Sequence, residues 1–124
     1  MTLTAMRWSS CEVLFLCLDA AIDVMGGKWK ALILWALQTG AMRFGELKRS
    51  VPGLSERVLI AQLKEMEASG LVHREVFHQV PPKVEYSLTE LGHSLITALL
   101  PLGEWGEKNM ARIEAIARRA QPRS

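Results

Sequence analysis

The pattern of hydrophobic and polar residues predicts a helix followed by a β-hairpin between residues 54 and 88. Leu59, Leu63 and Met66 recur at the spacing of one helical face, which predicts that this face packs on a core. Ser55 can begin the helix, because its hydroxyl can accept a hydrogen bond from a backbone N–H of the first turn. Gly70 can end it. The opposite, outward face carries Arg57, Ala61 and Lys64.

Two partly alternating segments rich in Val, Phe and Tyr follow this glycine and predict strands over residues 71–77 and 84–88. Residues 79–83 are expected to form the tip between them. Pro81 and Pro82 belong in the turn or at a sheet edge, because proline cannot donate a ladder hydrogen bond. A helix followed directly by a hairpin is the layout of a winged helix. An ordinary helix and hairpin of a small α+β domain would give the same pattern.

Three more helices are predicted before this segment, over residues 11–25, 28–37 and 44–51. The first is apolar around much of its circumference, which is typical of a helix buried between subunits. Gly26 and Gly27 separate it from the second helix. The third helix and the one beginning at Ser55 are joined by a short turn containing Pro52 and Gly53, which predicts a helix-turn-helix.

The region after the hairpin is expected to be helical. Thr89 is a candidate N-cap, and Pro101 and Gly103 are expected to kink or divide the helix before it continues over residues 105–120. A leucine seam is formed by Leu91, Leu95, Leu99 and Leu102. Residues 1–9 are expected to be disordered. A single domain is therefore predicted for residues 1–124, with a core over about 10–106 and a C-terminal helix and tail over 107–124.

Composition narrows the class of protein. The 124 residues suffice for one core, and 49% hydrophobic residues predict apolar surface left over for a partner. The two cysteines lie in no CxxC motif, and the three histidines share no metal-ligand spacing, which argues against a metal site or a disulfide framework. Trp29, Trp35 and Trp105 are assigned to the core or an interface and not to a ligand cage.

No nucleophile elbow, phosphate-binding glycine loop or carboxylate pair in an apolar setting is present, so neither an enzyme nor a cofactor is predicted. The apolar run over residues 13–18 is too short for a signal peptide or a membrane span, which predicts a cytoplasmic protein without a membrane partner.

Charge is distributed unevenly along the chain, although the net charge is only +2. Residues 43–64 carry five basic and two acidic residues, and residues 108–124 carry five basic residues and one acidic residue. Residues 84–107 carry only acids, four in number. Positive charge therefore gathers at the outward-facing helix and the tail, as nucleic-acid binding requires. A dimer would double this small patch, and phosphate neutralisation supplies most of the affinity for DNA.

Four motifs in this order resemble the HxlR-type winged helix-turn-helix transcription regulators, a MarR-like family, over about residues 17–106. They are GGKWKALIL from Gly26, RFGELKRSVPGLSERVL from Arg43, QLKEMEASGLVHR from Gln62 and VPPKVEYSLTELG from Val80. The resemblance implies a mainly helical fold with a small hairpin wing over residues 72–88. It also implies a homodimer, paired through N- and C-terminal helices, that acts on a pseudo-palindromic operator in double-stranded DNA. Repression is the commoner outcome in the family.

The resemblance places the helix that begins at Ser55 in DNA as the recognition helix. The candidate DNA-binding residues are Arg43, Ser55, Arg57, Ala61, Gln62, Lys64 and Lys83. Arg57 is the candidate for base reading, because an arginine can pair with two acceptors of guanine, although a phosphate contact is the alternative. Arg43 and Lys64 are assigned to phosphates. Lys83 is assigned to the wing tip, and Gln62 to a buttress near the core.

The input to such a regulator would be a small-molecule effector or cysteine oxidation. Redox-sensing members use a cysteine that precedes a proline and lies ten residues before the first glycine of GGKW. Cys17 lies nine residues before Gly26 and precedes Leu18, so it departs from this pattern. It is therefore either a redox sensor or a small hydrophobic residue of the core. The sequence does not decide between Cys11 and Cys17. A winged helix that binds another protein, without specific DNA binding, is the alternative function.

Overall fold

The chain folds into a mainly helical winged helix with a small antiparallel sheet, as the sequence predicted. The computed structural model describes residues 10–120, so the predicted disorder of residues 1–9 lies outside the described residues. The elements in order are α1 (Ser10–Met25), α2 (Lys28–Leu37), β1 (Met42–Arg43), α3 (Phe44–Ser50), α4 (Glu56–Ala68), β2 (Val72–Phe77), β3 (Lys83–Leu88), α5 (Glu90–Lys108) and α6 (Met110–Ala120).

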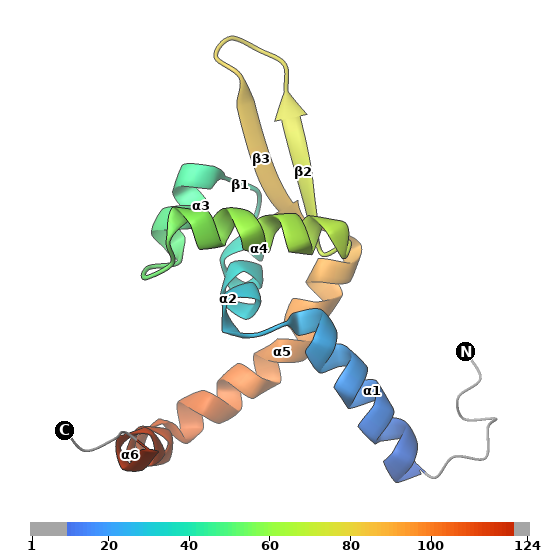
Figure 1. Cartoon of the computed structure of the whole chain (residues 1–124), viewed down its shortest axis with the longest axis vertical. Helices are drawn as coiled ribbons and strands as arrows, with labels where there is room; N and C mark the ends of the chain where they lie inside the picture. Colours follow the sequence, from blue (N-terminus) through green and yellow to red (C-terminus); the bar gives the residue numbers. More distant parts are fainter. Residues whose placement is uncertain (1–9, 121–124) are drawn as a thin grey trace.

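The described chain has a head and two arms (Figure 1). In the head, α4 lies across α2, and the hairpin of β2 and β3 projects past α3 and α4 at one end. At the other end α1 and the α5–α6 pair diverge from each other as two arms. The element that carries the outward basic face and the hairpin beside it are therefore held by the same body.

The head is held together by one hydrophobic core that begins in α2 and ends in the first half of α5. The sequence-predicted face of α4 supplies Leu59, Leu63 and Met66, which are all at most 2% exposed. The other members are Ile33, Leu34, Ala36, Leu37, Leu47, Val51, Leu54, Leu71, Val72, Leu88 and Ile96. Burial of each such large side chain contributes roughly 1.5–3 kcal/mol, so the core fixes how α4 and the hairpin sit on α2.

The sheet has three strands in the order β1-β3-β2, with one strand more than the sequence predicted. In β1, Met42 lies opposite Tyr86 and Arg43 lies opposite Glu85 of β3. Two residues are too few to show the alternation by which a strand is recognised in a sequence. This strand joins the middle of the hairpin ladder to the start of α3.

Pro101 and Gly103 were expected to kink or divide the C-terminal helix, and the division does not occur. α5 continues through Pro101 to Lys108, and the break falls at Asn109. The Nδ2 of Asn109 donates to the carbonyl oxygen of Trp105 at 2.8 Å, so a side chain competes there with the next helical hydrogen bonds. An exposed proline removes one donor only, and the helix is long enough to persist around it.

The leucine seam of α5 packs only in part on the core of the head. Leu95 and Leu99 are partly buried against that core beside the buried Gly92 and Ile96. Leu91 and Leu102 are more than half exposed. Gly92 sits so close to β2 that a methyl group in its place would overlap the carbonyl oxygen of Leu71. A glycine is therefore needed where α5 crosses the entrance to the hairpin.

Candidate nucleic-acid interface

The outward face of α4 is presented by a helix whose two ends are both fixed. The N–H of Val58 donates to the Ser55 hydroxyl at 3.2 Å, which confirms Ser55 as the N-cap. At the other end Gly70 adopts a positive φ of 80°, and the N–H of Leu71 donates to the carbonyl oxygen of Met66 at 2.9 Å. This is the Schellman arrangement that glycine favours. Because both ends are capped, side chains on α4 are held by a rigid element.

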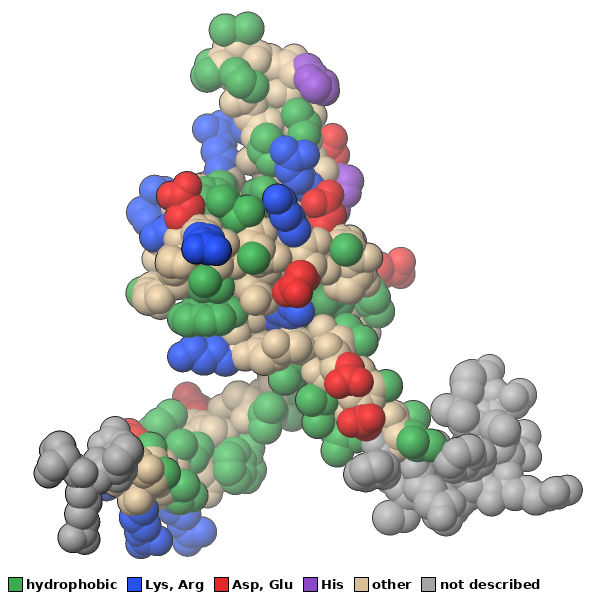
Figure 2. Space-filling view, viewed as in Figure 1, with side chains coloured by type: hydrophobic (Ala, Val, Ile, Leu, Met, Phe, Trp, Pro, Cys, Tyr) green, Lys and Arg blue, Asp and Glu red, His purple; other side chains and the backbone are tan. Residues whose placement is uncertain are grey.

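Arg57, Ala61 and Lys64 are all exposed and follow one another along the outward face of α4. Figure 2 shows Lys and Arg side chains gathered over the head, at α3, α4 and the base of the hairpin. None of the three salt bridges in the described part of the chain involves Arg57 or Lys64. Their charges therefore remain available for an anionic partner. The small Ala61 between them allows a close approach.

A groove of about 350 Å³ runs between α4 and the hairpin, and its lining contains a basic residue that the sequence reasoning missed. Arg74 of β2 is exposed and lines this groove together with Lys64 of α4. In register Arg74 lies opposite Tyr86, which also lines the groove. The alternation in the strand could have revealed it, because Arg74 shares a strand face with the buried Val72.

Arg43 lies in β1, immediately before α3, and is exposed. Its backbone N–H donates to the Glu46 carboxylate at 3.0 Å, which helps to begin α3. Its position in register with Glu85 puts it beside the middle of the β2–β3 ladder. The structure therefore groups Arg43 with the wing.

Lys83 does not lie at the wing tip, where the sequence analysis placed it. It is the first residue of β3, and its Nζ lies 4.4 Å from the centre of the Phe77 ring and 3.6 Å from a Glu85 carboxylate oxygen. Its side chain is only 23% exposed. Lys83 and Phe77 are the last paired residues of the hairpin, so the ladder extends one residue further than predicted and includes the lysine.

Gln62 and Cys17 differ from the other candidates in their surroundings. Gln62 is half-buried, and its Oε1 is buried without a hydrogen-bond partner among the described residues, which fits a buttress near the core better than DNA contact. Cys17 is exposed on α1, in the arm and away from α4 (Figure 1). Cys17 is therefore not a small buried hydrophobic residue in the single chain.

The described residues hold neither a group of acidic, histidine or cysteine side chains suited to a metal ion nor a helix long and apolar enough to cross a membrane. The chemistry that the head presents is thus that of exposed cations on a capped helix and an adjacent hairpin. These are the elements with which winged helices contact nucleic acid.

Comparison with known proteins agrees with this geometry. The family model of the HxlR-like helix-turn-helix matches residues 24–114. The HTH-type transcriptional regulator YybR of Bacillus subtilis is 50% identical over 97 residues, which cover 78% of each chain. The solved structure of the redox regulator HypR in its reduced form is 49% identical, covers 79% of this chain and 97% of that one, and superposes with a TM-score of 0.74.

A further structure, of a transcriptional regulator of the MarR family from Enterococcus faecalis, is 41% identical with a TM-score of 0.70. It covers 89% of this chain and 96% of that one. The family is one of transcriptional regulators and not of enzymes. The chain belongs to the HxlR-like helix-turn-helix family of transcriptional regulators.

Proposed function

We propose that this regulator is a homodimeric repressor that binds a pseudo-palindromic operator in double-stranded DNA, with α4 of each subunit in a major groove. The observation that carries the proposal is the exposed row of Arg57, Ala61 and Lys64 on a capped helix beside a projecting hairpin. α4 has 13 residues and is therefore about 20 Å long, a length that can lie in one groove.

In this complex Arg57, in the first turn of α4, reads a guanine through two hydrogen bonds. Ser55 caps the helix and can in addition reach a phosphate. Lys64 and Arg74, on opposite walls of the groove between α4 and the hairpin, contact phosphates and position the subunit without reading sequence. Arg43 contacts the backbone beside the wing. Lys83 can add to the field of the wing, although it already neutralises Glu85.

The arms support the homodimer. α1 exposes Leu18 and Ile22, and α6 exposes Ile116, although each of these side chains is apolar. On α5 Trp105 is 58% exposed. Apolar side chains gathered on elements that leave the head are typical of a protein interface. Two-fold pairing through the arms would place the two α4 helices on half-sites about 34–36 Å apart, or a multiple of that distance.

The signal that releases the operator is a small ligand or oxidation of Cys17, and either one would act through the arms. The exposed thiol on α1 lies where a second subunit is expected, so its oxidation would change the pairing of the subunits. HypR, to which the chain is similar, is described as a redox regulator.

The proposal is tested by the binding of the purified protein to the DNA upstream of its own gene, compared with a scrambled duplex at physiological salt. We expect a preference of about a thousandfold, which is at the lower end for specific regulators. Fluorescence anisotropy with labelled duplexes gives both affinities. Two protein chains per duplex are expected from a parallel sedimentation experiment.

Equal and weak binding to both duplexes, repeated with genomic fragments in a selection experiment, would contradict the proposal. That result would favour the alternative in which the outward face of α4 binds a protein. An arrangement with one chain per duplex would contradict the homodimer but not the recognition helix.

A further inference from the structure

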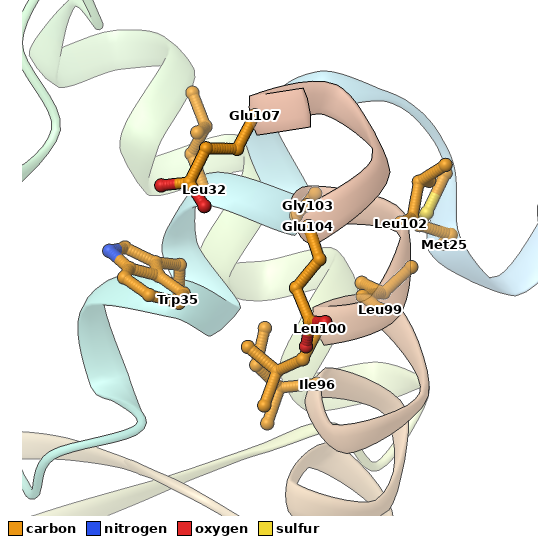
Figure 3. Close-up of a pocket in the computed structure, with 11 residues that line it drawn as sticks. Met25, Leu32, Trp35, Ile96, Leu99, Leu100, Leu102, Gly103, Glu104 and Glu107 are labelled. Atoms are coloured by element: carbon orange, nitrogen blue, oxygen red, sulfur yellow. The ribbon is translucent and has the colours of Figure 1, made fainter. Parts of the chain in front are cut away.

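A second groove, of about 550 Å³, lies on the arm side of the head between α2 and α5. Leu32 and Trp35 of α2 form one wall, and Ile96, Leu99 and Leu102 of α5 belong to the other (Figure 3). The volume lies within the range of small-molecule sites, and the lining is predominantly apolar as in such sites. This groove is separate from the interface formed by α4 and the hairpin.

The charge in the groove has one sign. Its charged lining residues are Glu104 and Glu107 of α5, and its lining includes no lysine, arginine or histidine. Neither carboxylate takes part in an ion pair among the described residues. Figure 3 shows the Glu107 side chain extending from α5 toward Leu32 and Trp35, and the Glu104 side chain extending along α5 toward Leu100. The groove thus offers two carboxylates to a partner that can neutralise them.

Trp35 adds a second feature that favours a cation. Its side chain is 57% exposed although it is one of the largest apolar groups of the chain, and it lines the groove. The electron-rich face of an indole attracts a cation within about 6 Å of the ring centre. Carboxylates and an indole around an apolar floor are the groups that recognise a positive charge carried by an apolar body.

We propose that this groove binds an organic cation with a large apolar or aromatic body, such as a lipophilic amine, quaternary ammonium or phosphonium ion, as the effector of the regulator. The effector role rests on the proposed function, whereas the binding site does not. The apolar body fills the space between Leu32 and Leu99, and the charge lies near Glu104, Glu107 and Trp35.

The first helix of a second copy is a poorer occupant of this groove. α1 presents Asp19 and Asp23 and contains no basic residue, so it would bring more negative charge to the two glutamates. Like charges that are brought together in a partly buried place disfavour binding. The arms can pair through their other exposed apolar side chains, and the groove can remain accessible to a ligand.

The position of the groove explains how a ligand would act on DNA binding. Ile96 lines the groove and is also a member of the buried core, with 5% of its surface exposed. α2, the other wall, contributes Ile33, Leu34 and Leu37 to the core beneath α4. A ligand between α2 and α5 would therefore change the angle between the arm and the head, and with it the separation of the two recognition helices.

The test uses the complete protein and two molecules of nearly the same shape, the methyltriphenylphosphonium cation and neutral triphenylphosphine oxide. Isothermal titration calorimetry without DNA should show one phosphonium ion per chain, bound about tenfold more tightly than the oxide. Tenfold corresponds to about 1.4 kcal/mol, the sum of modest contributions from partly exposed carboxylates and an indole. Equal affinity for the two compounds, or no saturable binding of the cation, would overturn the proposal.

Variants locate the site. The substitutions Glu104→Gln and Glu107→Gln together should remove the preference for the cation, and Trp35→Leu should weaken it severalfold. The matched control Asp19→Asn with Glu114→Gln removes the same number of charges from residues outside the groove lining and should keep the preference. A preference that survives in the groove variant, or disappears equally in the control, would overturn the assignment to this groove.

DNA binding is then measured with and without the phosphonium ion on the upstream duplex. A lower affinity in its presence supports the effector role, and an unchanged affinity at saturation contradicts it. If the cation binds but the protein recognises no DNA, the proposed function fails while the site stands. If DNA is recognised but no cation binds, the inference fails alone, and a groove filled by a second copy, for example by its arginine-containing α6, becomes the explanation.

Discussion

Replacement of Gly92 by alanine tests the packing of α5 against the hairpin. A methyl group at this position would overlap the carbonyl oxygen of Leu71, which accepts a hydrogen bond from the N–H of Thr89 at 3.1 Å. It would also press on the Leu88 side chain. The clash is with backbone and cannot be relieved by rotating a flexible side chain, so α5 and the start of β2 must move apart.

The expected loss combines three effects. Overpacking of this kind costs about 1–3 kcal/mol, and a weakened hydrogen bond adds about 1 kcal/mol. Alanine in a helix regains about 1 kcal/mol relative to glycine. The free energy of unfolding should therefore fall by about 2 kcal/mol, which lowers the melting temperature of a chain of this size by roughly 8 °C.

Thermal and urea unfolding, followed by circular dichroism at one fixed protein concentration, would measure both quantities. Gly103→Ala is the matched control, because a methyl group at Gly103 of the same helix meets no atom within 4 Å. The control should be unchanged or more stable by up to about 1 kcal/mol. A Gly92→Ala protein as stable as the control would refute the proposed close approach of α5 to Leu71.

Four other changes have distinct expected results. Ser55→Ala removes the acceptor of the Val58 N–H and should lower the free energy of unfolding by about 1 kcal/mol in urea, and no change would argue against capping. Arg57→Ala should cost about 1–3 kcal/mol of specific binding and relax the preference at one base pair per half-site, whereas an equal loss on scrambled DNA would contradict base reading. Arg74→Ala should weaken binding to all duplexes alike and reduce the dependence of log affinity on log salt by about one per subunit, and a change in base preference would contradict a phosphate role. Cys17→Ser should leave DNA binding intact and abolish any response to oxidants, so a response that persists would exclude Cys17 as the sensor.

The parts of the fold that could be predicted are those whose signal is local and periodic. The inward face of α4 follows directly from Leu59, Leu63 and Met66, and Ser55 and Gly70 mark its ends with residues suited to those positions. β1 could not be predicted in this way, because its two residues form a strand only through their pairing with Tyr86 and Glu85, more than forty positions later in the sequence.

The candidate site likewise contains residues whose positions could be predicted from local spacing and residues whose positions could not. The outward positions of Arg57 and Lys64 follow from helical spacing and were predicted. Lys83 was predicted to lie in the turn, because the two prolines before it do not show where the turn ends and the strand begins. In the structure it begins β3 and contacts Glu85 and Phe77. The groove position of Trp35 could not be predicted either, because helical spacing alone does not distinguish a tryptophan that lines an open groove from one in a core.

The break in α5 illustrates a further limit. Proline is the strongest helix breaker by propensity, yet the helix ends eight residues later at Asn109, where a side-chain hydrogen bond to Trp105 competes with the backbone. A helix propensity gives the free-energy cost of placing one residue in a helix, and contacts with neighbouring residues decide whether the helix persists despite that cost.

The buried core begins at Ile33 and ends at Ile96, and this order has a consequence for synthesis on the ribosome. The apolar α1 emerges before the head and α6 after it, so the two arms of one chain are synthesised at different times, on either side of a head that completes its own core between them. Domains fold as units while the chain grows. If the arms form the dimer, assembly must follow translation, and α1 must wait exposed until then.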